Sequence, residues 1–272
     1  MLSRVAEACF WMGRYIERAE NVARILDVNY HGVIENSAPE AEPSWWSVVA
    51  TTGDAAEFFR HYPRPTERHV TEFLALDPGN PNSVASCVKA ARENARRIRD
   101  RVSSETWEEL NRFYHVVSRQ TIDLVMQDGP YAFCRTVRNG SHLLAGVIDN
   151  TMPHDEGWQF LRAGRFLERA GMTARILDSQ AALLTRQVVG PDYAATHRWI
   201  AVLKSASAYE AHRKSHRGSI APEGVVTFLL FAEEFPRSAL ACVAEVEGTL
   251  RAIRALLGLP GVDPTAREAG AL

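Results

Sequence analysis

The residues best suited to chemistry in this sequence are arginines and glutamates that occur twice at the same spacing. The stretch Gly13 to Asp27 (GRYIERAENVARILD) returns as Gly164 to Asp178 (GRFLERAGMTARILD), with ten of the fifteen positions identical. An arginine can clamp a carboxylate or phosphate with two hydrogen bonds, and a desolvated glutamate with a raised pKa can transfer protons. The candidate ligand-binding residues in this region are Glu7, Arg14, Arg18, Arg24, Arg165, Arg169 and Arg175, and the candidate catalytic residues are Glu17 and Glu168.

Both copies have the periodicity of a helix with one apolar face, and the face that carries the charges is not purely polar. Ile25 lies in the middle of the charged arc, Ile176 repeats it in the second copy, and Met172 stands where the first copy has Asn21. This mixture predicts that the charged arc is partly buried. Because an unpaired buried charge is costly, we expect these side chains to pair with one another or with a ligand.

A purely structural interpretation stays open for the same residues. Arg14 and Glu17 are three residues apart and would form an ordinary ion pair on the helix surface, as would their counterparts in the second copy, at a few tenths of a kcal/mol each. The glycine that opens each copy argues for a tighter environment. Gly13 and Gly164 lie inside expected helices, where glycine costs about 1 kcal/mol relative to alanine, so we expect another helix to approach closely there.

Length, composition and motifs narrow the classes of function. The chain has 272 residues, 46% of them hydrophobic and 24% charged, with a net charge of −2, as expected of a globular protein. We expect a cytoplasmic protein without a membrane span, because no apolar run approaches about 18 residues and charges interrupt the N-terminus. Near-neutral charge argues against bulk nucleic-acid binding. No CxxC pair, HExxH, Walker or GxGxxG motif occurs, so no metal or cofactor is expected.

The pattern of helix caps, prolines and apolar periodicity predicts an all-α, multi-helix bundle. Further matches at shifts of 153 and 155 residues extend the duplication and predict pseudo-twofold internal symmetry within one domain. We expect repeat unit one at about 1–101, linking helices at about 102–151, repeat unit two at about 152–260, and a flexible tail at 261–272. The expected helices cover 3–35, 45–62, 70–76, 83–102, 104–126, 131–151 and a stretch from about 155 onward.

Three further groups of residues invite a functional interpretation. The basic stripe Lys89, Arg92, Arg96 and Arg99 is either a solvated face or a site for an anion or an acidic partner; Arg96 and Asn111 are candidate ligand-binding residues there. The run HRKSHR at 212–217 either binds phosphate or RNA or is an exposed helix C-terminus. The pair Trp45 and Trp46 is either an interface or part of the core.

Three long stretches of the sequence resemble the bacterial Alpha-E domain family. They are 1–29 (MLSRVAEACFWMGRYIERAENVARILDVN), 91–114 (ARENARRIRDRVSSETWEELNRFY) and 155–177 (DEGWQFLRAGRFLERAGMTARIL). The resemblance implies an all-helical protein of unassigned activity, encoded beside circularly permuted ATP-grasp ligases and transglutaminase-like cysteine peptidases. It therefore implies these two enzymes as partners in a peptide- or amide-forming system. It implies no catalytic residue.

These observations lead to three hypotheses for the function. The first is a helical partner that positions the substrate of an ATP-grasp-type ligase and uses the Glu and Arg residues as a bound site. The second is an enzyme that uses the same residues for acid/base chemistry on a peptide or small anionic substrate. The third and weakest is binding of RNA or a nucleotide through the arginine stripes, which would show steep salt dependence.

Overall fold

A computed structural model describes the chain except for residues 2, 36–44, 128, 185–191, 217 and 260–272. The described part is entirely helical and loop, as predicted for an all-α protein. The tail at 261–272 that was predicted to be flexible lies outside the described residues. The helices are α1 (Ser3–Glu35), α2 (Trp45–Thr52), α3 (Ala55–His61), α4 (Glu67–Ala75), α5 (Val84–Arg97), α6 (Ser104–Ser118), α7 (Ile122–Gln127), α8 (Tyr131–Thr151), α9 (Glu156–Leu184), α10 (Asp192–Ser205), α11 (Tyr209–Ser215), α12 (Pro222–Phe231) and α13 (Ala239–Leu256).

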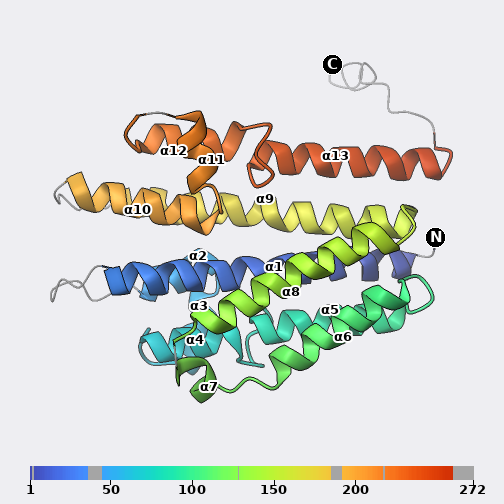
Figure 1. The fold of residues 1–272 in the computed structure, drawn as a ribbon, viewed down its shortest axis with the longest axis horizontal. Coiled ribbons are helices and arrows are strands. Elements are labelled where there is room, and N and C mark those ends of the chain that lie inside the picture. The colour runs from blue at the N-terminus through green and yellow to red at the C-terminus, as the bar shows by residue number, and fades with distance from the viewer. Residues whose placement is uncertain (2, 36–44, 128, 185–191, 217, 260–272) are drawn as a thin grey trace, which may run out of the picture.

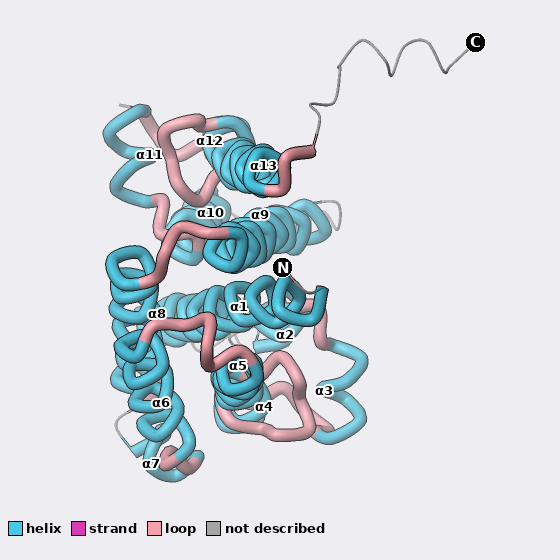
Figure 2. The backbone as a smooth tube through the Cα atoms, turned by 90° about the vertical axis from the view of Figure 1, so that its right-hand side faces the viewer, coloured by secondary structure: helices cyan, strands magenta, loops and turns pink. Residues whose placement is uncertain are grey.

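The two longest helices, α1 and α9, lie side by side at the centre and run in the same direction (Figure 1). Seen end-on, α13, α9, α1 and α5 are stacked in one column, with α6 and α8 beside it (Figure 2). The α1–α9 contact is the most extensive in the fold, followed by α9 with α13 and α1 with α5. The two copies of the repeated motif therefore face each other in the middle of the molecule.

Glycines allow α1 and α9 to touch backbone to backbone. A Cβ added at Gly13 would lie 2.1 Å from the carbonyl oxygen of Leu161, and a Cβ added at Gly164 would lie 2.1 Å from the carbonyl oxygen of Phe10. Real Cβ atoms essentially never come within 3.0 Å of such an atom. The close approach predicted from these two glycines is confirmed, and equivalent positions of the two copies make it.

Serine side chains begin several of the shorter helices. Ser83 accepts a hydrogen bond from the backbone N–H of Ser86 and caps α5, and Ser103 accepts one from Thr106 and caps α6. The sequence predicts Ser83 for the first cap and either Ser103 or Ser104 for the second. Ser238, at the position in the second half equivalent to Ser83, caps α13. The predicted bounds of α1 and α8 are also confirmed.

Three predicted helices are shorter than expected. The helix expected over 45–62 is broken into α2 and α3 at Gly53, whose φ of +83° suits glycine and cannot continue a helix. The helix expected over 104–126 ends at Ser118, and Thr121 starts α7 by accepting a hydrogen bond from the N–H of Leu124. Helix α5 ends at Arg97 rather than near 102, because the chain tightens there into a turn.

Apolar side chains from the central helices and their neighbours form one continuous core. The four cysteines belong to this buried interior. None of the helices in the part of the chain that the structure describes is long and apolar enough to cross a membrane.

Candidate functional site

The repeated Glu-Arg dipeptides of α1 and α9 bind each other across the central interface. Glu17 accepts hydrogen bonds from Nε and Nη2 of Arg169 at 2.7 and 2.8 Å. Glu168 accepts the equivalent pair from Nε and Nη2 of Arg18 at 2.7 and 3.0 Å. Each glutamate is thus held in a two-bond fork by the arginine of the other copy, which is the strongest geometry available to this pair of side chains. The expectation that these charges are buried and pair with one another is confirmed.

The outer arginine of each motif behaves differently in the two copies. Arg14 donates from Nε to Glu168 at 2.8 Å. Its counterpart Arg165 is 3.8 Å from Glu17 and 3.7 Å from Asp149, beyond hydrogen-bond distance of both. The outer arginine of the first copy, Arg14, is therefore hydrogen-bonded directly to a glutamate of the second copy, whereas Arg165 forms only longer ion pairs.

A residue from another loop accounts for this difference. Arg237, just before α13, donates from Nη1 to Glu17 at 3.3 Å. The equivalent position before α5 is Asn82, whose side-chain oxygen accepts a hydrogen bond from Nη1 of Arg18 at 2.6 Å. The second half therefore has a positive charge, that of Arg237, where the first half has the neutral Asn82. Arg237 binds the carboxylate of Glu17, which Arg165 would otherwise bind.

The extra arginine has a matching extra glutamate on α1. Glu20 accepts a hydrogen bond from Nη2 of Arg237 at 2.7 Å and is also bound by Nη2 of Arg24. Arg24 reaches further, to the hydroxyl of Ser207 at 3.0 Å, and His142 of α8 lies 3.5 Å from Glu20. We call the whole group the Glu/Arg cluster; it consists of Glu17, Glu20, Glu168, Arg14, Arg18, Arg24, Arg165, Arg169 and Arg237.

Glu20 and Arg237 are functional candidates that the sequence argument missed. The second copy has Gly171 in place of Glu20, so Glu20 is not among the residues that the duplication repeats. Alignment of the loops shows that an acid on α1 and a base before α13 are both present without counterparts in the other half. Such a complementary pair of differences is the sequence feature that could have revealed the contact.

The three glutamates of the cluster are almost fully buried and ionised. Their side chains are 5%, 2% and 1% exposed for Glu17, Glu20 and Glu168. Burial by itself raises the pKa of a carboxyl, but the arginines outweigh it and hold the pKa of all three below the usual range. The predicted raised pKa, which would make Glu17 or Glu168 a proton donor at neutral pH, is therefore wrong. The pKa is lowered instead, because each carboxylate faces at least two guanidinium groups.

The cluster holds more positive than negative charge, with six arginines against three glutamates. Burial and neighbouring arginines lower the pKa of Arg24 and Arg165. Nε of Arg24 and Nδ2 of Asn21 are buried N–H donors without a hydrogen-bond partner in the described structure. Surplus charge and spare donors together are the properties of a site that accepts an anionic group.

Two of the candidate residues from the same helices lie outside the cluster. Glu7 is exposed near the start of α1 and forms no ion pair with another described residue. Arg175 is exposed on α9, although the adjacent Ile176 is buried, and its positive charge acts on Asp54. The structure does not bring either of them to the central pairs.

The basic stripe of α5 forms a separate arrangement with α6. Arg92 donates to the side-chain oxygen of Asn111 at 2.6 Å, and its guanidinium lies over the rings of Trp107 and Tyr114. These contacts join α5 to α6 and give Asn111 a structural partner. Arg96 points outward with 61% of its side chain exposed and pairs with a glutamate one turn earlier. Arg96 and Asn111 therefore do not share one site, and ligand binding at either stays a prediction.

The groups most often used for nucleophilic or metal chemistry are poorly placed for it. Burial raises the pKa of the Cys9 and Cys87 thiols to about 12, and that of Cys242 to about 11. Among the described residues, no three His, Cys, Asp or Glu side chains come together in a way that would hold a metal ion. In the basic run at 212–217, His212 is buried and stacks on His216 at 4.4 Å between ring centres, and residue 217 lies outside the described part.

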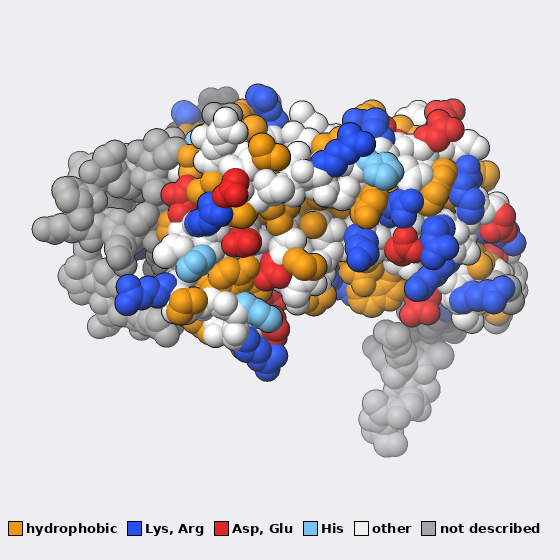
Figure 3. Space-filling model, turned by 90° about the horizontal axis from the view of Figure 1, so that it is seen from below, with side chains coloured by type: hydrophobic (Ala, Val, Ile, Leu, Met, Phe, Trp, Pro, Cys, Tyr) orange, Lys and Arg blue, Asp and Glu red, His pale blue; other side chains and the backbone are white. Residues whose placement is uncertain are grey.

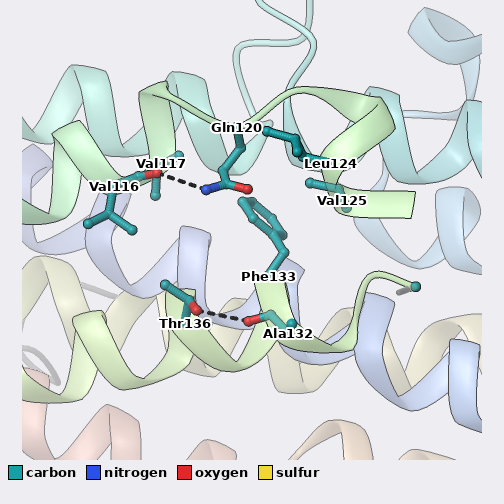
Figure 4. Close-up of a pocket in the computed structure, with 9 residues that line it drawn as sticks. Val116, Val117, Gln120, Leu124, Val125, Ala132, Phe133 and Thr136 are labelled. Carbon is teal, nitrogen blue, oxygen red and sulfur yellow. Dashed lines mark hydrogen bonds between the residues drawn. The ribbon is translucent and has the colours of Figure 1, made fainter. Parts of the chain in front are cut away.

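A concave feature lies away from the cluster, between α6 and α8 (Figure 4). It consists of two adjoining hollows of about 230 and 220 Å³ that share Val116 and Thr136. We call it the α6–α8 groove. The residues that line it are Arg112, Phe113, Val116, Val117, Gln120, Leu124, Val125, Gly129, Ala132, Phe133, Thr136, Asn139, Gly140 and Leu143. No residue of the Glu/Arg cluster lines either hollow.

The family of the chain follows from a match over its whole length. A family model described as "a predicted alpha-helical domain with a conserved ER motif" matches residues 1–272. The chain belongs to the Alpha-E family. Glu-Arg dipeptides occur at 17–18 and 168–169 inside the repeated stretch, and a third occurs at 67–68 outside it. We interpret the two in the repeat as the ER motif, because the glutamate of each binds the arginine of the other.

Relatives of this Alpha-E chain have no assigned activity. It is 27% identical over 282 residues to Uncharacterized protein Rv2567 of Mycobacterium tuberculosis and to Uncharacterized protein Mb2597 of Mycobacterium bovis. Each match covers 97% of this chain and 30% of the relative, so the chain spans about a third of the length of these proteins. No solved structure matches significantly.

Proposed function

We propose that this Alpha-E chain is a helical partner in a bacterial peptide- or amide-ligation system, where it docks on an ATP-grasp-type ligase and positions the substrate. The observation that carries the proposal is the pairing of Glu17 and Glu168 with arginines. A carboxylate bound in a two-bond fork and held at a low pKa is a weak base and does not donate a proton at neutral pH. The proposal therefore gives these glutamates the role of holding the arginines in place, and it assigns them no acid/base chemistry.

The relatives support a role as a module that acts together with further protein domains. This chain corresponds to about 30% of each mycobacterial relative, so in those proteins the same unit is joined to a larger polypeptide. A unit that is joined to further polypeptide in its relatives suits a positioning partner. The ligase and a transglutaminase-like peptidase enter the proposal through the family resemblance.

The surplus positive charge of the Glu/Arg cluster supports a second element of the proposal. A carboxylate or phosphate on the substrate would neutralise the arginines that lack a full set of acceptors, above all Arg165, whose side chain is 24% exposed. Arg165→Gln should then weaken binding of an anionic substrate while the Glu17–Arg169 fork stays intact. Arg251→Gln, at an arginine of α13 whose side chain is 75% exposed, is the matched control.

Binding of RNA through the arginine stripes has less support. Figure 3 views the molecule from below and shows arginine and lysine interspersed with acidic side chains instead of a field of one sign. Several exposed arginines are already paired with acids; examples are Arg60, Arg96, Arg112 and Arg251.

The experiment that tests the proposal is co-purification of a tagged chain with the ATP-grasp-type ligase and the peptidase encoded near it, followed by an assay for amide-bond formation. The proposal predicts a complex and a ligase whose product forms faster with the partner present. A ligase that neither binds the chain nor responds to it would refute the proposal. Formation of product by the isolated chain would favour the enzyme hypothesis instead.

A further inference from the structure

The α6–α8 groove is built by the part of the chain that has no second copy. Helices α6, α7 and α8 occupy 104–151, between the two repeat units predicted from the sequence. Of these helices, α8 packs on α1, and α6 packs on α5 and α8. The segment therefore adds a lateral face to the central column (Figure 2). The groove is lined by residues of this segment, and Figure 4 shows the lining of one of its two hollows.

The groove has an apolar floor and apolar side chains at its mouth. Phe113, Val117 and Phe133 form the floor and are at most 6% exposed. Leu124 and Leu143 stand at its two ends and are 55% and 48% exposed. A hollow of 220 to 230 Å³ is larger than the roughly 150 Å³ that accommodates a benzene ring, so each hollow holds one large apolar side chain.

The spacing of the two hollows matches consecutive turns of an α-helix. Their lining residues are displaced by about four positions along α6 and about six along α8, which at about 1.5 Å per residue separates the hollows by about 6 to 9 Å. Side chains four residues apart on a helix are separated along its axis by about 6 Å. A helix laid between α6 and α8 would therefore place two side chains of one face into the two hollows.

The rim of the groove is positively charged. At about 100° per residue, Arg119 on the capping turn of α6 and Arg135 on α8 fall beside the lining positions on the solvent side. Both are exposed, and neither forms an ion pair with another described residue. Arg112 lines the groove and is balanced by Glu109. A partner with acidic residues flanking its apolar face would complement this rim.

We propose that the α6–α8 groove binds an amphipathic helix of a partner protein, with two large apolar side chains four residues apart and acidic residues on both flanks. This inference rests on the proposed function, because it assigns the docking surface of the positioning partner. The apolar side chains fill the hollows on either side of Thr136, and the acidic flanks face Arg119 and Arg135.

The direct test uses a capped 15-residue alanine-based peptide with leucines four residues apart and glutamates on both flanks, and a matched peptide with lysines in place of the glutamates. Binding to the whole chain is measured by fluorescence anisotropy at low ionic strength. The glutamate peptide should bind about tenfold more tightly than the lysine peptide, since the rim charges reverse from attraction to repulsion. Equal binding of the two peptides, or no binding of the glutamate peptide, would overturn the proposal.

Three variants locate the binding. Thr136→Trp fills the junction of the hollows and should weaken binding of the glutamate peptide about tenfold or more. Arg119→Glu combined with Arg135→Glu should reverse the preference between the two peptides. Leu250→Glu replaces a leucine of α13 that is 50% exposed on another face, and should leave binding unchanged. Circular dichroism must show equal helicity for all variants; unchanged binding to a folded Thr136→Trp variant refutes the groove.

Capture of the ligase separates this inference from the proposed function. If Thr136→Trp no longer captures a ligase that the wild type and Leu250→Glu both capture, the groove is its docking site. If all three capture it, the proposed function stands and the groove is refuted as its site. If none does, the proposed function fails, and the peptide measurement alone decides whether the groove binds a helix. Self-association of the wild type that Thr136→Trp abolishes would make a second copy the occupant and overturn the proposal.

Discussion

Alanine at either of the two central glycines should destabilise the protein, although alanine is the better helix former. The added Cβ at Gly13 or Gly164 would lie 2.1 Å from a carbonyl oxygen of the other helix. The obstacle is backbone, which cannot rotate away as a flexible side chain could. To reach an ordinary contact, α1 and α9 must separate by about 1 Å, which also stretches the hydrogen bonds of the Glu17–Arg169 fork.

The magnitude follows from two opposing effects. Replacing glycine by alanine in a helix stabilises it by about 1 kcal/mol, whereas overpacking costs about 1 to 3 kcal/mol and more when backbone must move. Since the clash here is with backbone on both sides of the interface, we expect a net loss of about 2 kcal/mol for Gly13→Ala and a similar loss for Gly164→Ala. Urea denaturation followed by circular dichroism measures both.

Gly171→Ala is the matched control for these variants. It lies on α9 in the same repeated stretch, and a Cβ there would meet nothing within 4 Å. We expect it to raise the free energy of unfolding by up to about 1 kcal/mol. If Gly13→Ala behaves like Gly171→Ala, the backbone contact between the central helices is wrong, and with it the register that pairs the two ER motifs.

Three further predictions concern the buried charges and thiols. Glu168→Ala should cost about 3 kcal/mol in urea denaturation because Arg14 and Arg18 lose their carboxylate; a loss below 1 kcal/mol would mean that the pairs are solvated surface contacts. The pKa of each cluster glutamate is lower in the folded state than the ordinary 4.5, so unfolding takes up protons in acid and stability should fall as the pH drops below about 4.5; a flat profile down to pH 3 would contradict this. The four buried cysteines should resist a thiol reagent at pH 8 in the native protein and react in urea, which a colorimetric thiol titration checks.

The sequence was sufficient to predict features that depend on local patterns. The bounds of α1 and α8 follow from periodicity and prolines. Residue type predicts the cap at Ser83 and leaves Ser103 and Ser104 open for the next one, which in the structure is Ser103. The close approach at Gly13 also follows from sequence, because glycine inside a helix is destabilising relative to alanine and is explained by the close contact of another helix. In each case a few neighbouring residues contain the cause.

Features that depend on how distant helices are placed could not be predicted. The charged arc of α1 indicated that its residues pair, but the choice of partner depends on the register between α1 and α9. Arg237 reaches Glu20 from a loop more than two hundred residues away. The breaks at Gly53 and after Ser118 also escaped prediction, although each falls in a run without apolar residues, TTGD at 51–54 and SRQT at 118–121.

The α6–α8 groove is a further feature of this kind. Its lining comes from α6, α7, α8, Gln120 and Gly129, and their spacing depends on how the helices pack in the fold, so no single stretch of sequence predicts the groove. The basic stripe of α5 shows the reverse case. Its pattern suggested a site, and the structure shows that Arg92 is engaged with Asn111 and two aromatic rings in the packing of α5 on α6, while a site at the exposed Arg96 stays a prediction.

The measurement that tests the central claim most directly compares the wild type with a Glu17→Gln/Glu168→Gln double variant in a reconstituted mixture with the ATP-grasp-type ligase. Glutamine keeps the shape and a hydrogen-bond acceptor while removing the carboxylate, and circular dichroism confirms that both proteins are folded. The account predicts that product formation by this double variant, which keeps every arginine of the cluster, follows the amount of complex that it forms with the ligase. A variant that binds the ligase like the wild type but abolishes product formation would contradict the account and make the two glutamates a chemical site.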